Sequence, residues 1–450
     1  MPIRRLTVKN IQAHAVSLSS TAVLLLGLTG AGAAHAGGNV CGSPFVPTPV
    51  LHPILPSPNF PQSDGAVNCF MWQTFVYLTW PALAGQAGQP DPNASYGSNN
   101  PTVWETFRPH NTVFLPHGAK PAPWGNAKAQ LALFSARGLK KPLPNVRVLN
   151  STSKKFRAFN SGEAANLTET QQAGGGVLVD QNGQTVYYEM LMNQTEFNYI
   201  VNNTLYEANA QNAFAKSTGI ELPTNAVEVK PAWKVLSAAE LAAKPVRFHT
   251  AQALLPGQST PVTVGLVGLH VLVMPDNSTF EQGFWATFQQ VDNAPLQGST
   301  PTGTYSFYNV NCPQCPVNTQ GQGNTPTQVV QVFGTTSAAQ AVNQAMQQAI
   351  VSQNPQSPWQ FYQLINVQWP TSGQPINKAG MTVPLPNGSP NTNTLMNPVL
   401  ETYLQVPNMS CLGCHTNASA AGGGAFGSSY SFLLGHAKTA SAGALKAKPR

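Results

Sequence analysis

Charged side chains are scarce in this sequence. Only 9% of the 450 residues are Asp, Glu, Lys or Arg, against about 25% in a typical soluble domain. The formal net charge is +7, and no basic stretch is interleaved with aromatic residues, which argues against nucleic acid as a partner. So small a charge gives only weak electrostatic steering of an acidic protein partner. The polar surface must therefore come from Asn, Gln, Ser and Thr.

After the N-terminal segment, the chain has no long hydrophobic run. No stretch there reaches the roughly 18 apolar residues that a membrane span needs. The N-terminus itself has the three parts of a secretory signal peptide. These are a basic start, a short apolar run and a small-residue cleavage site: Arg4, Arg5 and Lys9, residues 21–29, and Ala34-His35-Ala36. We predict a signal peptide over 1–36, cleaved before Gly37, and a periplasmic or secreted bacterial protein with no membrane span in the mature chain. Arg4-Arg5 raises the twin-arginine route, but the residues that follow fit that motif poorly, so ordinary secretion is favoured.

Only six cysteines are present, and two of them lie in Cys411-Leu412-Gly413-Cys414-His415. C-x-x-C-H is the spacing that attaches a c-type haem, because two thiols add to the vinyl groups while the adjacent imidazole ligates the iron. A bare redox dithiol or half of a zinc site is the alternative, and no second C-x-x-C-H or H-x-x-H completes a zinc site. We therefore predict one covalent haem c, attached at Cys411 and Cys414 with His415 as the proximal iron ligand.

The other four cysteines form an even set in an oxidising compartment, which predicts disulfides. Three pairings are possible, and we favour Cys41–Cys69 and Cys312–Cys315. The second pair also has C-x-x-C spacing, but Pro316 stands where a haem motif has histidine. It cannot be a second ordinary haem site, and we favour a structural clip on a Pro-rich loop over a catalytic dithiol.

Hydrophobic periodicity predicts an α+β chain with a β-rich central domain, flanking helices and a short C-terminal haem-c segment packed against it. The expected helices are residues 68–80 with Asn68 as N-cap, 195–216, 337–351, 397–404 and a second aromatic helix around 359–369, whose tryptophans faintly echo the first. The expected strands are 227–229, 246–249, 262–273 and 284–288, together with a hairpin around Asn182-Gly183. Strand 262–273 is continuously apolar and should be central.

The haem motif lies near the C-terminus, and no methionine follows Cys411. Small class I cytochromes c carry the motif early and an axial methionine well downstream, so this chain does not have that fold throughout. We predict a signal peptide and four further parts: a Pro/Gly-rich lead-in at 37–66, a large α+β domain at 67–390, a haem-attachment segment at 391–437 and a flexible basic tail at 438–450.

Several segments together resemble a family of secreted bacterial proteins known as "cytochrome c family protein", with a large N-terminal α+β domain and a single C-terminal C-x-x-C-H. The segments are Trp72–Pro81, Val103–Phe107, Val229–Trp233, Val264–His270, Trp285–Phe288 with Val291–Asn293, Glu401–Gln405 and the haem motif. The resemblance covers about residues 65–435 and implies haem attachment at Cys411 and Cys414 with proximal ligation by His415. It implies no substrate.

The sixth iron ligand decides the chemistry, because methionine raises the potential, a second histidine lowers it and an open position admits small molecules. The main candidates are His270, His436, Met274 and Met396, with His270 foremost although a lone buried histidine is more often a core residue. Further candidates are His249, His110, His117 and the lysines after the motif, whereas Met409 is too close to Cys411 to reach around the haem edge easily. Arg108, His110 and His117 could also assist peroxide chemistry, although a solvated loop with turns fixed by proline is the favoured interpretation.

Three functions remain open from the sequence. The leading hypothesis is an exported monohaem electron carrier that acts with a redox protein partner. The second is a haem-c enzyme of peroxidase or oxidase type, because the chain is far larger than a carrier needs and a small-molecule substrate would fit the large domain. The third is a binding or sensor module that haem stabilises. Whether the chain is an enzyme is undecided at this stage.

Overall fold

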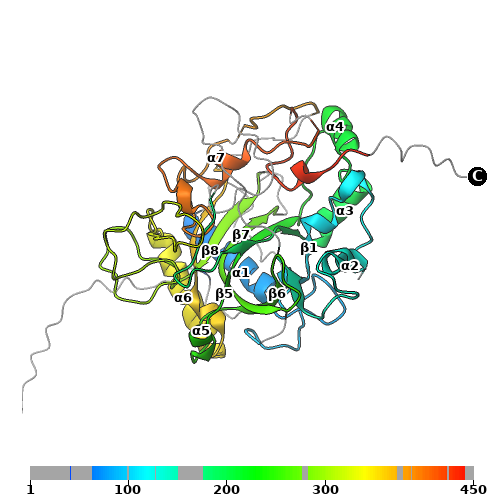
Figure 1. Cartoon of the computed structure of the whole chain (residues 1–450). Helices are drawn as coiled ribbons and strands as arrows, with labels where there is room; N and C mark the ends of the chain where they lie inside the picture. The colour runs from blue at the N-terminus through cyan, green and yellow to red at the C-terminus, as the bar shows by residue number, and fades with distance from the viewer. Residues whose placement is uncertain are drawn as a thin grey trace, which may run out of the picture. The chain divides into compact units, whose positions relative to one another are not determined.

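A mixed sheet of nine strands organises the described part of the chain (Figure 1). The computed structural model describes residues 41, 63–98, 101–126, 128–149, 176–275, 282–371, 379–386, 388–422 and 425–440. The predicted signal peptide, most of the predicted lead-in and the last ten residues of the predicted tail lie outside the described residues. Residues 39–450 form one unit. The presence of both helices and a curled mixed sheet confirms the predicted α+β class.

The strands are β1 (Arg108–Pro109), β2 (Val146–Val148), β3 (Tyr187–Tyr188), β4 (Leu191–Met192), β5 (Val227–Val235), β6 (Thr250–Leu254), β7 (Val262–Val273), β8 (Phe284–Gln290) and β9 (Tyr362–Gln368). The α-helices are α1 (Asp64–Thr79), α2 (Lys128–Ser135), α3 (Gln194–Asn202), α4 (Ala208–Ser217), α5 (Ala238–Ala242), α6 (Ser337–Gln353) and α7 (Cys411–His415). Short 3-10 helices include η2 (His110–Thr112), η3 (Pro116–Gly118), η6 (Pro358–Phe361), η7 (Thr402–Leu404) and η8 (Leu434–His436).

Strand β7 is the centre of the sheet, as its apolar sequence predicts. It pairs antiparallel with β5 along one edge. On its other edge β6 pairs with its N-terminal part and β8 with its C-terminal part, and β9 continues beyond β8. Side chains alternate between the two faces of a strand, so Leu269, Val271 and Val273 face one way, while His270 and Leu272 face the other.

One face of the sheet packs against α1 and α6 around a large aromatic core. Phe75 of α1 stacks on Phe288 of β8 with ring centroids 4.3 Å apart, and Trp72 donates from its indole nitrogen to Asn343 of α6 at 2.7 Å. Ser63 caps α1 by accepting from the backbone N–H of Ala66. The helix therefore begins before the predicted cap at Asn68, because the sequence 64–67 offers no apolar periodicity to reveal this first turn.

Two predictions about helices are wrong. Residues 195–216 form two helices, α3 and α4, because the chain turns between them with Thr204 at φ 55°. Residues 359–369 form the short η6 and the strand β9. β9 forms by pairing with β8, and the spacing of the aromatic residues in 359–369 does not reveal this long-range contact. Because β9 is a strand and α1 is a helix, the predicted similarity between the two aromatic segments is not a structural one.

Smaller differences concern element ends. Residues 246–249 precede a strand, since β6 begins at Thr250, and within 397–404 only η7 is a regular helix. The predicted hairpin is confirmed, with Val179 bridged to Thr185 and Gly183 at φ 75°. Among the described residues, no helix combines the length and apolar character needed to cross a membrane.

The second face of the sheet carries the C-terminal part of the chain. Leu272 of β7 and Trp285 of β8 pack with Leu412 and Tyr430 in one buried cluster. Gly268 lets the chain approach closely, because a Cβ there would lie only 2.7 Å from Val399 Cγ2. In Figure 1 this arrangement brings α7 over the end of β7 and β8.

Candidate functional site

The C-x-x-C-H pentapeptide forms the one-turn helix α7. Ser410 caps it by accepting from the backbone N–H of Gly413 at 3.2 Å. Leu412 points into the cluster against β7 and β8, and its backbone N–H donates to the Gln368 side chain at 2.6 Å. The buried leucine and this hydrogen bond thus attach α7 to the sheet. Cys411, Cys414 and His415 of the same turn stay partly exposed.

Cys411 and Cys414 are the free cysteines of the structure, whereas the other four are paired. Burial raises the pKa of the Cys414 thiol to about 11, and the Glu401 carboxylate contributes in the same direction. The pKa of Cys411 is also raised well above its ordinary value, chiefly by burial. Redox-active dithiols need at least one thiol with a lowered pKa. These two thiols have the opposite electrostatics, which disfavours a catalytic dithiol.

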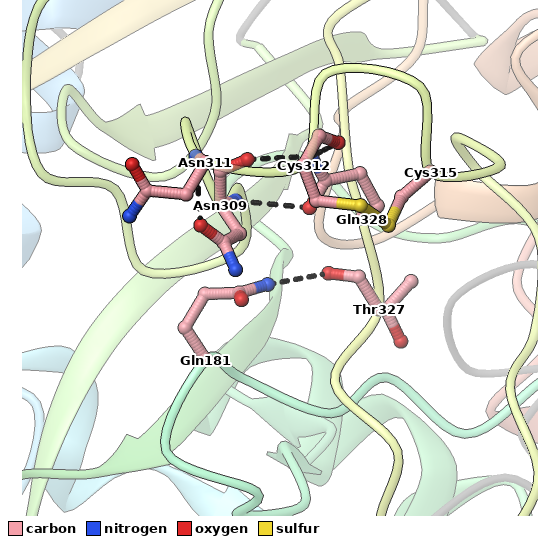
Figure 2. Close-up of a disulfide and its surroundings, with 7 residues drawn as sticks. All are labelled: Gln181, Asn309, Asn311, Cys312, Cys315, Thr327 and Gln328. Atoms are coloured by element: carbon pink, nitrogen blue, oxygen red, sulfur yellow. Dashed lines mark hydrogen bonds between the residues drawn. A yellow bond between two sulfur atoms is a disulfide. The ribbon is translucent and has the colours of Figure 1, made fainter.

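The second C-x-x-C is closed. Cys41–Cys69 and Cys312–Cys315 are both disulfides, which confirms the predicted pairing. Gln328 holds the Cys312 turn by donating to the carbonyls of Cys312 and Asn309, at 3.1 and 3.0 Å (Figure 2). The neighbouring Gln181 donates to the Thr327 carbonyl at 3.0 Å. These hydrogen bonds from glutamine amides connect the disulfide loop to neighbouring segments. They are consistent with the predicted structural role of the Cys312–Cys315 disulfide.

His415 is oriented by its backbone neighbour across the turn. Its Nδ1–H donates to the Tyr430 carbonyl at 2.7 Å, so its Nε2 carries the lone pair. Trp285 and Phe432 both contact the ring, with ring centroids 4.3 and 4.6 Å from that of His415. Burial lowers the pKa of His415 to about 3. The imidazole is therefore neutral at physiological pH and presents a fixed nitrogen lone pair.

His270 is the histidine candidate that the fold brings to α7. It stands on the same face of β7 as Leu272, which packs with Leu412 of α7. Met274 lies in the cluster beside Leu412, although its side chain is buried among apolar neighbours. Met396 is buried as well. Met409 lies directly beside the motif, with its Sδ 3.1 Å from Cys414 Sγ.

The remaining candidates make their contacts in other parts of the structure. The rings of His436 and His110 pack with their centroids 4.5 Å apart, next to a cluster that contains Leu433 and Leu434. His249 stacks on Trp359 on the α1 side of the sheet. Arg108 donates to the Ala122 carbonyl and lies over the Phe197 ring. His117 is exposed in η3. The possible peroxide-assisting group Arg108, His110 and His117 is therefore not assembled around α7.

Two charged residues of the site were missed by the sequence analysis. Lys230 lies directly opposite His270 across the β5–β7 ladder, and Glu401 Oε1 is 3.2 Å from His270 Nε2. Burial lowers the pKa of Lys230, although the Glu401 charge opposes this. Burial raises the pKa of Glu401, but His270 and Lys230 outweigh it and the net shift is downward. For Lys230, the available signal was the alternation of Glu228 and Lys230 with the valines at the start of β5.

Comparisons with protein-family models, with curated protein sequences and with solved structures give no significant match to this chain. The site must be interpreted from its own geometry.

Proposed function

We propose that this chain is an exported monohaem c-type cytochrome that transfers electrons to or from a redox protein partner. Cys411 and Cys414 would attach the haem, and His415 would ligate the iron from the proximal side. The haem would supply one-electron redox chemistry when bound. The observation that carries this proposal is the hydrogen bond from His415 Nδ1 to the Tyr430 carbonyl, because metal-ligating histidines almost always donate their other ring N–H in this way.

The residues of α7 fit a haem c in three further respects. The two motif thiols are free, while the equally spaced Cys312 and Cys315 are joined. The low pKa of His415 keeps its ligating nitrogen unprotonated. Trp285 and Phe432 both pack against the His415 ring, with ring centroids 4.3 and 4.6 Å away. Each of these features would be expected of a proximal side that stays rigid during electron transfer.

A haem-c enzyme is the second candidate function. It is favoured by the group Lys230, His270 and Glu401, which we call the polar triad. Burying an ammonium and a carboxylate costs several kcal/mol of desolvation unless the pair is well compensated. A haem that only carries electrons does not need this pair, whereas small-molecule chemistry uses such groups to bind substrates and move protons.

The absorption spectrum of the exported protein tests both functions, with expression in a host that carries the cytochrome c maturation system. Haem bands that survive denaturation support the haem assignment, and their absence contradicts it. A low-spin ferric spectrum that azide, cyanide and peroxide leave unchanged supports the electron carrier. A high-spin ferric spectrum that responds to these ligands supports the enzyme.

A further inference from the structure

Charged side chains are distributed unevenly along the chain. Residues 293–437 make up nearly a third of the sequence, yet Lys378 and Glu401 are the only charged residues among them. Lys378 lies outside the described residues, so Glu401 is the one charged side chain in the described part of this stretch. The C-x-x-C-H motif lies inside the stretch. The chain before and after the motif is therefore uncharged over long distances.

Two uncharged segments contact the C-x-x-C-H turn α7 or the residue that follows it. The segment before α7 includes Met409, whose Sδ lies 3.1 Å from Cys414 Sγ. The other segment includes Leu385, whose backbone N–H donates to the Thr416 carbonyl, directly after α7, at 2.8 Å. Both segments thus lie against the place where the haem would be attached.

A third uncharged segment is joined to the first by a hydrogen bond. Thr394 Oγ1 accepts from the backbone N–H of Asn408 at 3.1 Å. The three segments and the end of α7 contain no Asp, Glu, Lys or Arg. We call them together the uncharged surface, which consists of residues 381–386, 388–394, 406–409 and 413–417.

Apolar side chains are exposed on the uncharged surface. Val406 has 48% of its surface exposed, the largest fraction among the exposed large hydrophobic side chains of the described residues. Three prolines are exposed as well: Pro384, Pro386 and Pro407. Exposed apolar groups that are surrounded by polar ones are typical of protein–protein interfaces. Both motif cysteines are partly exposed next to these segments, so a haem bonded to their sulfurs would adjoin the uncharged surface.

The charged side chains on adjoining elements come in both signs. Lys230 and Glu401 are close enough that the charge of each shifts the pKa of the other. Lys216 is exposed where the end of α4 meets Gly380, and Glu221 is exposed a few residues later in the chain. Each pair sums to zero, so these neighbours give the uncharged surface no net charge.

The lack of charge limits the kind of partner that fits. Charged groups on a partner would be removed from water on binding, and the uncharged surface offers no opposite charges to compensate them. Apolar groups on a partner would gain free energy by covering Val406 and its neighbours. Without electrostatic steering we expect association at about 10⁵–10⁶ M⁻¹ s⁻¹, whereas charge-paired partners reach roughly 10⁸–10⁹ M⁻¹ s⁻¹ at low salt.

We propose that the uncharged surface is the docking site for a redox protein whose own docking face is uncharged and apolar. This inference rests on the proposed electron-transfer function and names the class of partner. The interface is expected to be small, because electron-transfer complexes often bury less than about 1,200 Å². Salt should affect it little, because no charges pair across it.

The test uses the full-length holoprotein and two purified blue copper proteins of similar reduction potential as probes. One probe has an uncharged apolar face over its copper, and the other has an acidic face there. Stopped-flow absorbance follows the transfer of one electron from the ferrous holoprotein to the cupric probe, which leaves the ferric holoprotein and cuprous copper. As a measure of binding alone, the isotope-labelled cuprous probe is titrated with the ferrous holoprotein, and the changes in its NMR shifts give a Kd.

Three variants locate the docking site. Val406→Lys adds a charge to the uncharged surface, and Val406→Thr keeps the shape of the side chain but makes it polar. Gln344→Lys is the matched control, because it adds the same charge at an exposed position of α6, which packs on the opposite face of the sheet from α7. Covalent haem content is measured first for every protein, by the pyridine haemochrome spectrum after denaturation.

The wild-type protein and Gln344→Lys should react faster with the uncharged probe, at a rate constant that changes less than about twofold between ~0.1 and ~1 M salt. Val406→Lys should raise the Kd for this probe about tenfold, and Val406→Thr should raise it by a smaller factor. Val406→Lys should also react faster than the wild type with the acidic probe, and high salt should remove this gain.

Two results would overturn this inference. One is a wild-type holoprotein that prefers the acidic probe or reacts with neither probe. The other is a Val406→Lys variant that behaves like Gln344→Lys in both measurements. A protein without covalent haem would instead refute the proposed function.

Discussion

His415 donates from Nδ1 to the backbone carbonyl of Tyr430 at 2.7 Å. This carbonyl is presented by an unusual turn, in which Ser429 and Tyr430 both have positive φ, at 53° and 63°. Side chains other than glycine seldom adopt this conformation, and each such residue costs on the order of 1–3 kcal/mol. The surrounding contacts, with Tyr430 fully buried, must hold the turn. Backbone strain next to the C-x-x-C-H turn fits a site where position matters more than local stability.

The double variant Cys411→Ala/Cys414→Ala should lose all covalent haem, because no thioether can then form. Haem staining of a denaturing gel measures this. The matched control is Cys312→Ala/Cys315→Ala, which removes the same C-x-x-C spacing from a loop already closed by a disulfide. The control should stain like the wild type. Staining of the first variant, or its loss in a folded control, would show that the attachment site has been placed wrongly.

Gly268→Ala should destabilise the segment that carries Glu401. The added Cβ would meet Val399 Cγ2 at 2.7 Å and Leu400 Cδ1 at 3.2 Å, and overpacking of this kind costs about 1–3 kcal/mol. Urea unfolding measures the loss. Gly303→Ala is the matched control, because its nearest neighbour would be 3.8 Å away. Equal unfolding midpoints for the two variants would mean that the approach of this segment to β7 is not tight.

Stability should fall as pH rises between about 4.5 and 7, in part because of Glu196 and Glu228. Burial raises the pKa of Glu228 to about 7, and burial and the Glu228 charge raise that of Glu196 well above its usual range. The folded protein therefore keeps protons that the unfolded chain releases above pH 4.5, so this contribution is complete below that pH and declines above it.

Comparing the wild type with Glu196→Gln/Glu228→Gln in urea unfolding from pH 5 to 8 isolates this effect. The variant should lose the slope, and the difference between the two proteins should change by on the order of 2–3 kcal/mol across the range. Parallel stability curves would show that the carboxyl pair titrates normally in the folded protein.

Lys234→Met should destabilise the protein by about 3–5 kcal/mol, because it leaves a buried charge unpaired. Lys234 Nζ lies 3.2 Å from Asp180 Oδ2 and 2.5 Å from Glu240 Oε1. The side chain of Asp180 has no exposed surface. Arg247→Met is the control, since the Arg247–Asp292 pair is much more exposed and should contribute about 1 kcal/mol or less. Thermal or urea unfolding measures the loss of stability in both variants. Similar losses in Lys234→Met and Arg247→Met would contradict the prediction that the buried ion pair contributes more than the exposed one.

The local elements of the fold were predictable because their signals are local. The continuous apolar run predicted β7, the Asn182-Gly183 turn predicted the hairpin, and the Ala/Gln-rich stretch predicted α6. The even number of remaining cysteines predicted two disulfides, and of the three possible pairings the favoured one is observed. Strand β9 was not predicted, because its apolar spacing suits a helix as well as a strand. Only its pairing with β8 decides between the two.

Only the C-x-x-C-H part of the candidate site is visible in the sequence. The spacing of Cys411, Cys414 and His415 is visible in the sequence, but the far side of the site depends on strand register. The register of β5 against β7 places Lys230 beside His270, and the close approach at Gly268 brings the segment of Glu401 onto the same face. Neither relationship is visible in the sequence, because the first depends on strand register and the second joins segments more than 100 positions apart in the chain.

Peptide mass spectrometry tests the central claim most directly. The protein is exported in a host with the cytochrome c maturation system, purified, digested and analysed for the peptide that contains Cys411–His415. We predict that this peptide carries the mass of one haem bound through both cysteines, and that the peptide with Cys312 and Cys315 carries none. Recovery of the Cys411–His415 peptide without haem, from protein that is exported and folded, would contradict the account.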